Sequence, residues 1–346
     1  MKALLKSKKN QLAYVDCENP VIKNPQEVLV KIIYSSFCGS DMERLKSDDK
    51  DWDSVILGHE AVGQVVKIGN EVENLKIGDK VVIIPLVPCY SCTFCISGEY
   101  ALCTNYIFIG SRINGTFAEY IVVNQANLLK INNDKKIYKY VFLEPLTVAL
   151  HAIYKTKFLF GDRAAILGAG TQGLLILQIL KSLGLFEILI TDIDINKLKI
   201  ANDLKADFCI NVGKKDLMSS LKDINEKDFN ITFEASGSEE AKRDSLLVTG
   251  QNGTIVLIGT SPKNVMFEGN IFELITRKEL KLYGSWMSYS APFPGIEWFS
   301  AKKILDNNYI NVDHMITHKF KIDEVDKINH SIFKNNESHC KIIIEM

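Results

Sequence analysis

The sequence predicts an α/β protein in which a β-rich domain comes before a doubly wound parallel sheet. The first 150 residues contain short Val/Ile runs separated by Gly and Pro, a pattern typical of a small barrel or sandwich-like domain. From about Gly161 apolar strands alternate with apolar helices, which indicates parallel strands joined by right-handed crossovers. The length of 346 residues also fits about two domains.

The expected strands of the β-rich part are rich in β-branched residues, which favour a pleated sheet. They include Val28–Tyr34, Val62–Ile68 and Lys80–Ile84, and glycines or prolines lie between them. Residues 1–150 are therefore assigned to one β-rich domain.

The alternating part is expected over residues 151–284. Its strands are expected at Arg163–Leu167, Glu187–Thr191, Phe208–Asn211, Asn230–Glu234 and Thr254–Ile258, and its helices at Thr171–Leu183, Asn196–Leu204 and Glu239–Val248. After about Tyr283 the pattern is irregular again, with a helix expected over Glu297–Asp306 and a strand over Lys341–Glu345. Residues 285–346 are therefore treated as a separate C-terminal segment.

Charge and hydropathy limit the partners of the protein. Lys and Arg total 41 against 42 Asp and Glu, a net charge of −1, so nothing favours nucleic acid or an anionic membrane. The most apolar stretch, Leu174–Ile190, contains Gln178 and Lys181, and a buried helix followed by a strand explains it better than a membrane span. The first ten residues carry four lysines and no apolar core, so we expect no secretory signal and a cytoplasmic protein.

A Gly-x-Gly-x-x-Gly motif at residues 168–173 lies between an expected strand and an expected helix, which is the setting of a dinucleotide site. Gly168 permits the tight turn, Gly170 lets the backbone approach a pyrophosphate, and Gly173 lets the helix pack close to the strand. Asp192, 19 residues further on, would accept hydrogen bonds from ribose hydroxyls and repel a 2′-phosphate. The pattern favours NAD over NADP; the alternative is a structural turn with an ordinary surface aspartate.

Half of the eight cysteines fall within 15 residues, at Cys89, Cys92, Cys95 and Cys103. In a chain without an export signal, such clustering indicates metal binding rather than disulfides. Four thiolates at this spacing can close a tetrahedral site with no open position, so we expect a structural Zn²⁺. The alternatives are an iron–sulfur cluster and a chance arrangement.

Three further segments contain possible ligands, but no spacing rule joins them. Cys38 lies in Cys-Gly-Ser-Asp, His59 and Glu60 lie in Leu-Gly-His-Glu, and Glu144 lies in Leu-Glu-Pro-Leu. Taken singly, Cys38 could be a buried thiol, His59 a core imidazole, and Glu144 a carboxylate at a helix start.

The order of all these motifs resembles that of the zinc-containing medium-chain alcohol and polyol dehydrogenases, over essentially the whole chain. The stretches that carry the resemblance most specifically are Pro85–Cys95, Phe108–Val123 and Arg277–Trp298. The resemblance implies a GroES-like catalytic domain and an inserted Rossmann domain, with the C-terminal segment rejoining the first domain. It also implies a homodimer.

The resemblance further assigns roles to the candidate residues. It implies two zinc ions per chain, a structural ion on the clustered cysteines and a catalytic ion on Cys38, His59 and Glu144. Glu60 would be a neighbouring or exchanging ligand, and Ser40 would be the hydroxyl of the proton relay. The relay histidine that the family carries five residues after the zinc cysteine is replaced here by Glu43.

The activity that the resemblance implies is oxidation of a secondary hydroxyl of a polyol phosphate by NAD, with galactitol 1-phosphate giving tagatose 6-phosphate. Free polyols such as sorbitol or iditol are the alternative substrates, and a non-catalytic nucleotide-binding protein is a third interpretation. Arg44, six residues after Cys38, and Arg112 are candidates for holding a phosphate, since a guanidinium can donate two parallel hydrogen bonds. Each could instead be a solvated surface arginine.

Overall fold

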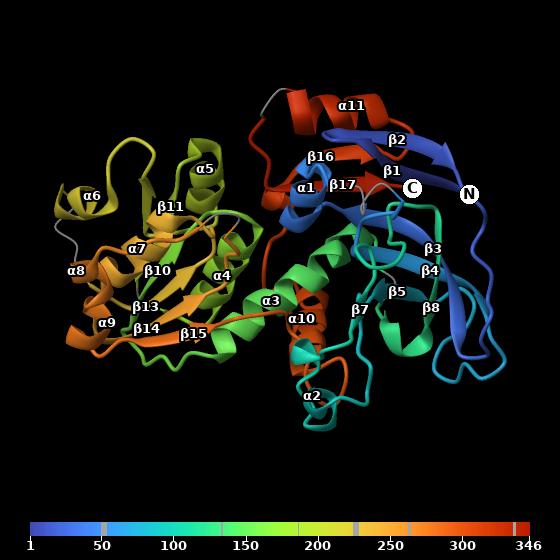
Figure 1. The fold of residues 1–346 in the computed structure, drawn as a ribbon, viewed down its shortest axis with the longest axis horizontal. Coiled ribbons are helices and arrows are strands. Elements are labelled where there is room, and N and C mark those ends of the chain that lie inside the picture. The colour runs from blue at the N-terminus through green and yellow to red at the C-terminus, as the bar shows by residue number, and fades with distance from the viewer. Residues whose placement is uncertain (50–53, 133, 186, 224–227, 262–263, 335–336) are drawn as a thin grey trace. The chain divides into compact units, whose positions relative to one another are not determined.

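The structure, a computed structural model, describes residues 1–49, 54–132, 134–185, 187–223, 228–261, 264–334 and 337–346. The chain divides into two compact units (Figure 1). The first unit contains Met1–Glu144, Tyr289–Asp306 and Ile316–Met346, and the second contains Pro145–Ser288 and Asn307–Met315.

The boundaries between these two units differ from those expected from the sequence. The boundary expected at residue 150 falls inside helix α3 (Leu143–Tyr154), which belongs to the second unit from Pro145 onwards. Gln172 Nε2 holds it there by donating to the Pro145 carbonyl (3.1 Å). The boundary at 284 moves to 288, and residues 307–315 leave the C-terminal segment, because one of their backbone amides donates to Gln178 Oε1 (2.7 Å).

The first unit is built on a seven-stranded sheet with the order β16-β17-β3-β4-β5-β9 and with β8 also paired to β3. Its strands are β3 (Glu27–Ser36), β4 (Glu60–Ile68), β5 (Lys80–Ile83), β8 (Tyr120–Asn124), β9 (Leu128–Lys130), β16 (Ile316–Lys321) and β17 (Lys341–Glu345). The alternate residues Val28, Val30 and Ile32 of β3 are buried and share a core with Val65 and Val81. The three runs expected as strands thus correspond to β3, β4 and β5, although β5 ends at Ile83, one residue earlier than expected.

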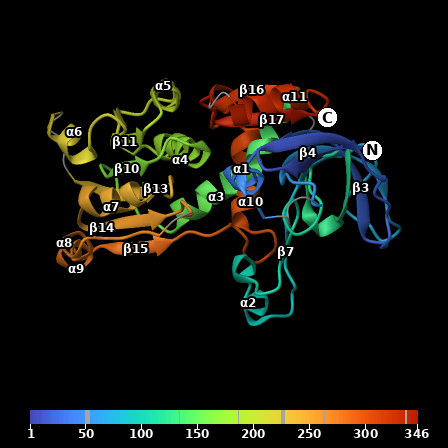
Figure 2. The same cartoon turned by 45° about the horizontal axis from the view of Figure 1, so that its top comes forward.

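Shorter elements complete this unit. The two-stranded pairs are β1 (Lys2–Lys8) with β2 (Gln11–Asp16) and β6 (Leu86–Val87) with β7 (Ile107–Phe108). The helices are α1 (Gly39–Lys46), α2 (Thr93–Ile96), α10 (Ile296–Asp306) and α11 (Val325–Asn329), with further helical turns at Tyr100–Leu102, Gln125–Asn127, Ile137–Phe142 and His330–Lys334. The expected C-terminal strand is confirmed: β17 pairs with both β3 and β16, so the end of the chain lies beside the strand that leads to α1 (Figure 1, Figure 2).

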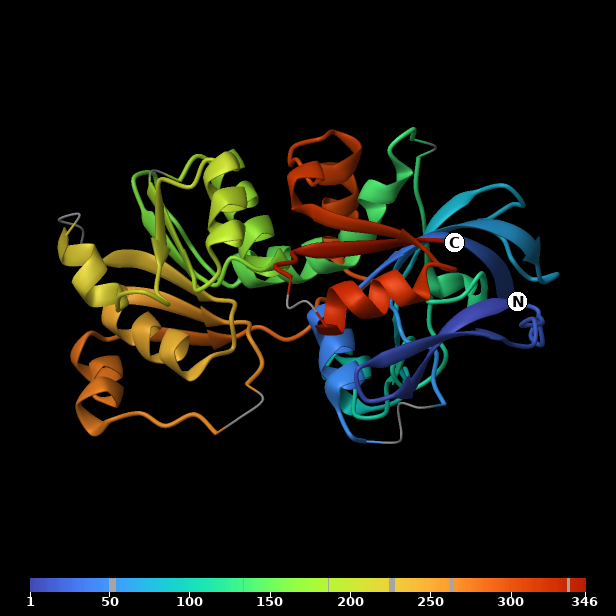
Figure 3. The ribbon, with the colours of Figure 1, turned by 90° about the horizontal axis from the view of Figure 1, so that it is seen from above.

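The second unit is a sheet of six parallel strands in the order β12-β11-β10-β13-β14-β15. Its strands are β10 (Arg163–Leu167), β11 (Glu187–Asp192), β12 (Phe208–Asn211), β13 (Phe229–Glu234), β14 (Thr249–Leu257) and β15 (Lys281–Gly284). Its helices are α4 (Thr171–Ser182), α5 (Ile195–Asp203), α6 (Leu217–Asp223), α7 (Glu239–Val248), α8 (Gly269–Phe272) and α9 (Leu274–Arg277), with a turn at Asp313–Met315. Figure 3 shows the yellow-green α5 on one side of this sheet and the orange α8 and α9 on the other.

This arrangement is the doubly wound sheet that the sequence predicts. The strand order reverses at β10, which lies between β11 and β13, and ligands of such sheets bind at the carboxyl ends of the strands beside this reversal. The elements α6, α8, α9 and β15 were not among those expected from the sequence.

Candidate active site and metal centres

The end of β3 and the start of α1 position Cys38. Cys38 has an extended backbone and directly precedes the first turn of the helix. The carboxylate of Asp41 is completely buried and accepts a hydrogen bond from the Cys38 backbone N–H (3.1 Å). An acidic group in the first turn stabilises the start of a helix, so Asp41 fixes the backbone that carries the thiol.

His59 lies directly before β4, and the turn that presents it requires glycine. Gly58 has φ of +91°, and a Cβ atom there would come within 2.5 Å of the Phe117 ring. His59 Nδ1 lies 3.5 Å from Asp41 Oδ1. Burial opposes a charge on the imidazole, but the Asp41 carboxylate and the Cys38 sulfur outweigh burial and raise the pKa of His59 well above its ordinary value.

Cys38, His59 and Glu60 form a group whose potential ligand atoms all lie within 4.8 Å of one another. His59 and Glu60 are buried, and Cys38 is partly buried. Sulfur, imidazole nitrogen and carboxylate oxygen are the ligands that Zn²⁺ prefers in proteins. The residues present therefore fit a zinc ion.

The Glu60 carboxylate has two further partners in the interior. Ser36 Oγ donates to Glu60 Oε2, and Lys341 Nζ donates to the same oxygen at 2.6 Å. Lys341 is 1% exposed and also donates to the Phe37 carbonyl (3.3 Å). Burial would lower the pKa of Lys341, but the charges of Glu60 and Cys38 outweigh burial and raise it. Strand β17 thus supplies the positive charge that balances Glu60.

Glu144, the second residue of α3, is not part of the group of three. Its carboxyl group is buried and interacts electrostatically with His59, Glu60 and Lys341. Burial raises the pKa of Glu144 to about 7; His59 opposes this rise and Glu60 adds to it. The structure thus places Glu60 within 4.8 Å of Cys38 and His59, and places Glu144 in the same charged neighbourhood.

The two candidate arginines differ in their surroundings. Arg44 Nη1 on α1 donates to Ser40 Oγ at 3.0 Å and lies 3.4 Å from Asp41 Oδ1. Arg112 Nη1 instead donates to the Tyr106 carbonyl (2.5 Å), and its guanidinium stacks 4.0 Å from the centre of the Tyr106 ring. Arg44 therefore lies on the same helix as Ser40, directly after Cys38, whereas Arg112 contacts a partly buried loop residue close by in the chain.

The four clustered cysteines form a second group with all sulfur atoms within 4.8 Å of one another. The backbone N–H of Cys89 donates to the Cys103 sulfur (3.3 Å), and that of Cys92 donates to the Cys89 sulfur (3.4 Å). Hydrogen bonds from Ser91 and Cys92 lower the pKa of Cys89 to about 6, which favours the thiolate. Four sulfur ligands fit a closed zinc site.

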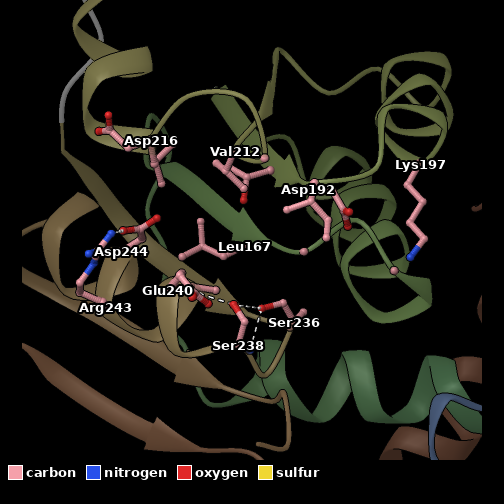
Figure 4. Close-up of a pocket in the computed structure, with 18 of the residues that line it drawn as sticks. Leu167, Asp192, Lys197, Val212, Asp216, Ser236, Ser238, Glu240, Arg243 and Asp244 are labelled. Atoms are coloured by element: carbon pink, nitrogen blue, oxygen red, sulfur yellow. Dashed lines mark hydrogen bonds and ion pairs between the residues drawn. The ribbon is translucent and has the colours of Figure 1, made fainter. Parts of the chain in front are cut away.

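A cavity of about 740 Å³ lies in the second unit at the carboxyl ends of β10, β11, β12 and β13 (Figure 4). Figure 4 shows Asp192 and Lys197 on one side of it and Arg243 and Asp244 on the opposite side. Its size and its place beside the reversal of strand order suit a nucleotide.

The glycines of the motif have different environments at this cavity. Gly168 has φ of +112°, and a Cβ atom on Gly173 would lie 1.9 Å from the Gly168 carbonyl oxygen. Gly170, which lines the cavity, has nothing within 4 Å of its Cβ position, so its backbone is open to close approach. Asp192 Oδ2 accepts the Ala169 N–H at 2.8 Å, which joins the end of β11 to the glycine-rich loop. A carboxylate oxygen has a further lone pair, so Asp192 can also accept from a ribose hydroxyl.

Comparison with known proteins agrees with this geometry. Residues 24–133 match the family Alcohol dehydrogenase GroES-like domain, and residues 173–301 match the family Zinc-binding dehydrogenase. The chain is 34% identical over 317 residues to galactitol 1-phosphate 5-dehydrogenase of Escherichia coli K12, covering 91% of this chain and 92% of that protein. It is 29% identical to sorbitol dehydrogenase of Bacillus subtilis, covering 87% and 85%. The crystal structure of galactitol-1-phosphate dehydrogenase from Escherichia coli superimposes with a TM-score of 0.93 at 32% identity, covering all of both chains.

The protein therefore belongs to the zinc-containing medium-chain alcohol and polyol dehydrogenases. It is an oxidoreductase with a GroES-like domain and a Rossmann domain, as the motif order predicts. Among the described residues, no helix combines the length and the hydropathy that crossing a membrane would require.

Two charged residues beside Cys38, His59 and Glu60 were not among the candidates from the sequence: Asp41 and Lys341. Asp41 was visible as an acidic residue in the first turn after Cys38, which is a recognisable capping signal. Lys341 had no such signal, because 281 residues separate it from Glu60.

Proposed function

We propose that this protein is a zinc-dependent, NAD-linked polyol-phosphate dehydrogenase that converts galactitol 1-phosphate to tagatose 6-phosphate. The observation that carries the proposal is helix α1, which follows Cys38 directly and holds the Arg44 guanidinium against Ser40. One short helix thereby joins a metal-binding residue, a hydroxyl for proton transfer and a cation suited to phosphate. The identity of 34% to a galactitol 1-phosphate 5-dehydrogenase supports the same substrate class.

Cys38, His59 and Glu144 are the proposed ligands of the catalytic zinc, and Glu60 is the proposed exchanging ligand. Zinc held by these residues would supply a Lewis acid that lowers the pKa of the substrate hydroxyl. Cys38 and Glu144 together balance the charge of the ion. Glu60 would make the site anionic, but its ion pair with the buried Lys341 (2.6 Å) offsets that charge.

Ser40 is the proposed first acceptor of the substrate proton. The substrate hydroxyl proton would pass to Ser40, and NAD would supply the acceptor for the carbinol hydrogen and its electron pair, so that the secondary alcohol would become a ketone. Arg44 donates to Ser40 Oγ, which stabilises electron density on that oxygen during the transfer. Glu43 stands where the family carries its relay histidine, and we assign no residue to the outer end of the proton path.

The remaining cofactor assignments concern the second unit and the segment that carries Cys89, Cys92, Cys95 and Cys103, which we call the four-cysteine lobe. We propose the four clustered cysteines as ligands of a structural zinc, and NAD as the occupant of the cavity beside Gly168 and Asp192. The 2′-phosphate of NADP would lie against the Asp192 carboxylate and would be repelled by it.

Arg44 is the proposed phosphate ligand. It is 21% exposed, so it is largely desolvated yet within reach of a ligand, and its contacts with Ser40 and Asp41 orient it. Arg112 is the weaker candidate, because its guanidinium already stacks on Tyr106 and donates to the carbonyl of that residue.

The test is a screen of NADH or NADPH formation from galactitol 1-phosphate, other polyol phosphates and the matching free polyols, followed by Arg44→Ala. We expect turnover with NAD and the polyol phosphate in the wild type. In Arg44→Ala we expect a rise of about 10–100-fold in KM for the phosphate, well above any rise for the free polyol, since a charge-assisted hydrogen bond contributes about 1.5–3 kcal/mol.

Arg112→Ala is the matched control and should leave the ratio of the two KM values unchanged. Removing Arg44 also removes the contact with Ser40, so kcat should fall for both substrates, and only the KM ratio reports on the phosphate. An equal rise in both KM values would favour the second candidate, a dehydrogenase of free polyols, which the 29% identity to a sorbitol dehydrogenase supports.

A further inference from the structure

Tyr289 carries a buried hydroxyl group that the proposed mechanism does not use. The residue is 3% exposed, and its oxygen has no hydrogen-bond partner among the residues that the structure describes. A hydroxyl taken out of water without a partner is costly, so such groups in native proteins call for an explanation.

The ring of Tyr289 is held in place, so the hydroxyl cannot turn towards solvent. It stacks on Phe293 with ring centres 6.2 Å apart and planes 13° apart, and it packs on Trp298 at 5.6 Å. Its backbone carbonyl accepts the N–H of Ala101, which lies between two cysteines of the lobe (3.2 Å). The position of the hydroxyl is therefore determined by packing.

The neighbouring contacts place this ring beside the start of α3. Ser288, directly before Tyr289, shares a hydrogen bond of 2.5 Å with the Thr147 hydroxyl, and Thr147 lies one helical turn after Glu144. On its other side Tyr289 lies close to the backbone of Leu86, whose strand β6 pairs with Phe108 of β7. The Phe108 ring packs edge-on against His59 at 5.4 Å.

Electrostatics agree with this placement. Burial raises the pKa of the Tyr289 phenol well above its ordinary value, and the charge of Glu144 raises it further. A phenol with its ordinary pKa of about 10 carries its proton near neutral pH, so Tyr289 can donate a hydrogen bond. Glu144 is the carboxylate that acts on it.

We propose that Tyr289 is a positioning residue for Glu144 when zinc is bound: its hydroxyl, which has no hydrogen-bond partner among the described residues, then donates to one oxygen of the carboxylate and leaves the other oxygen for the metal. The inference rests on the proposed function, in which Glu144 is a zinc ligand. Carboxylates that bind metals are themselves held by hydrogen bonds, and the loss of such a partner costs about 10–100-fold in metal affinity or activity.

Tyr289→Phe tests this proposal, because it removes the hydroxyl and keeps the ring. Zinc per chain and the release of zinc to a chromophoric chelator are measured on the full-length protein, together with kcat/KM and the melting temperature. We expect one of two zinc ions to be released at about 10–100-fold lower chelator concentration, with a similar loss of kcat/KM and little change in melting temperature.

Tyr100→Phe is the matched control. Tyr100 is partly exposed and belongs to the same aromatic cluster, 5.6 Å from Phe293, and its loss should leave zinc release unchanged. Wild-type zinc release in Tyr289→Phe would overturn the proposal, and so would a lower melting temperature without a change in zinc release. Failure of the proposed function is recognised separately: Glu144→Ala would then keep both zinc ions, whatever Tyr289→Phe does.

Discussion

The four-cysteine lobe and the cluster around Cys38 are both suited to zinc, but they are assembled in opposite ways. The lobe draws all its sulfur atoms from 15 consecutive residues around the short helix α2. The cluster draws Cys38 from the end of β3, His59 and Glu60 from the start of β4, and Lys341 from β17. The geometry of the lobe is therefore a local property of the chain, whereas that of the cluster depends on the pairing of three strands.

The two regions also differ in charge. In the lobe, sulfur atoms are surrounded by backbone N–H groups and by one another, and their pKa values diverge: hydrogen bonds lower that of Cys89 to about 6, whereas burial raises that of Cys95 to about 12. In the cluster, acidic groups lie beside cations, as in the pair of Glu60 with Lys341. The lobe is suited to hold one ion permanently, and the cluster is suited to tolerate changes of charge during a reaction.

The largest expected effect is that of Glu144→Ala on catalysis. Removing a proposed ligand should lower kcat/KM by about 10³-fold or more, because a Lewis acid contributes several kcal/mol to the barrier. Zinc content, measured by mass spectrometry of the metal, should fall from two ions per chain to one. Binding of NAD, measured by fluorescence titration, should persist, since its cavity is lined by residues of the second unit. Full zinc content together with normal turnover would remove the distinction between the two regions.

Cys95→Ser should show the reverse pattern, with a loss of stability as the main effect. A structural metal contributes directly to folding, and we expect a melting temperature lower by about 10 °C or more and one zinc ion per chain. Cys17→Ser is the control, because Cys17 lies in the same unit and is not among the four cysteines of the lobe. A Cys95→Ser protein that is as stable as the wild type but inactive would place the chemistry in the lobe.

Lys341→Met should give a smaller effect that sharpens the comparison. It leaves the Glu60 carboxylate buried without its cation, which costs about 3–5 kcal/mol and should lower the melting temperature by about 6–12 °C. The double variant Glu60→Gln/Lys341→Met should recover part of that loss, because no unpaired charge remains.

The control for this prediction is Lys2→Met, which breaks the exposed pair with Asp16 and should change the melting temperature by no more than about a degree. If Lys341→Met were as stable as this control, the buried ion pair would have no part in holding the cluster together.

The sequence by itself determined those features whose partners lie near one another along the chain. The strand–glycine–helix context predicted the doubly wound sheet with Asp192 at the end of its second strand, and the spacing of the four cysteines predicted the lobe. These follow from periodicity and short-range geometry, which residue order specifies directly. The resemblance to a family then brought Cys38, His59 and Glu144 together, although no spacing rule joined them.

Only the tertiary structure decided which charged groups surround that cluster. It placed Glu60 in the group of three, gave it Lys341 as a partner, and set Arg44 against Ser40 while Arg112 turned to Tyr106. It also moved residues 307–315 into the second unit. The physical reason is that a buried charge requires a partner in space, and the pairing of strands decides where along the chain that partner comes from.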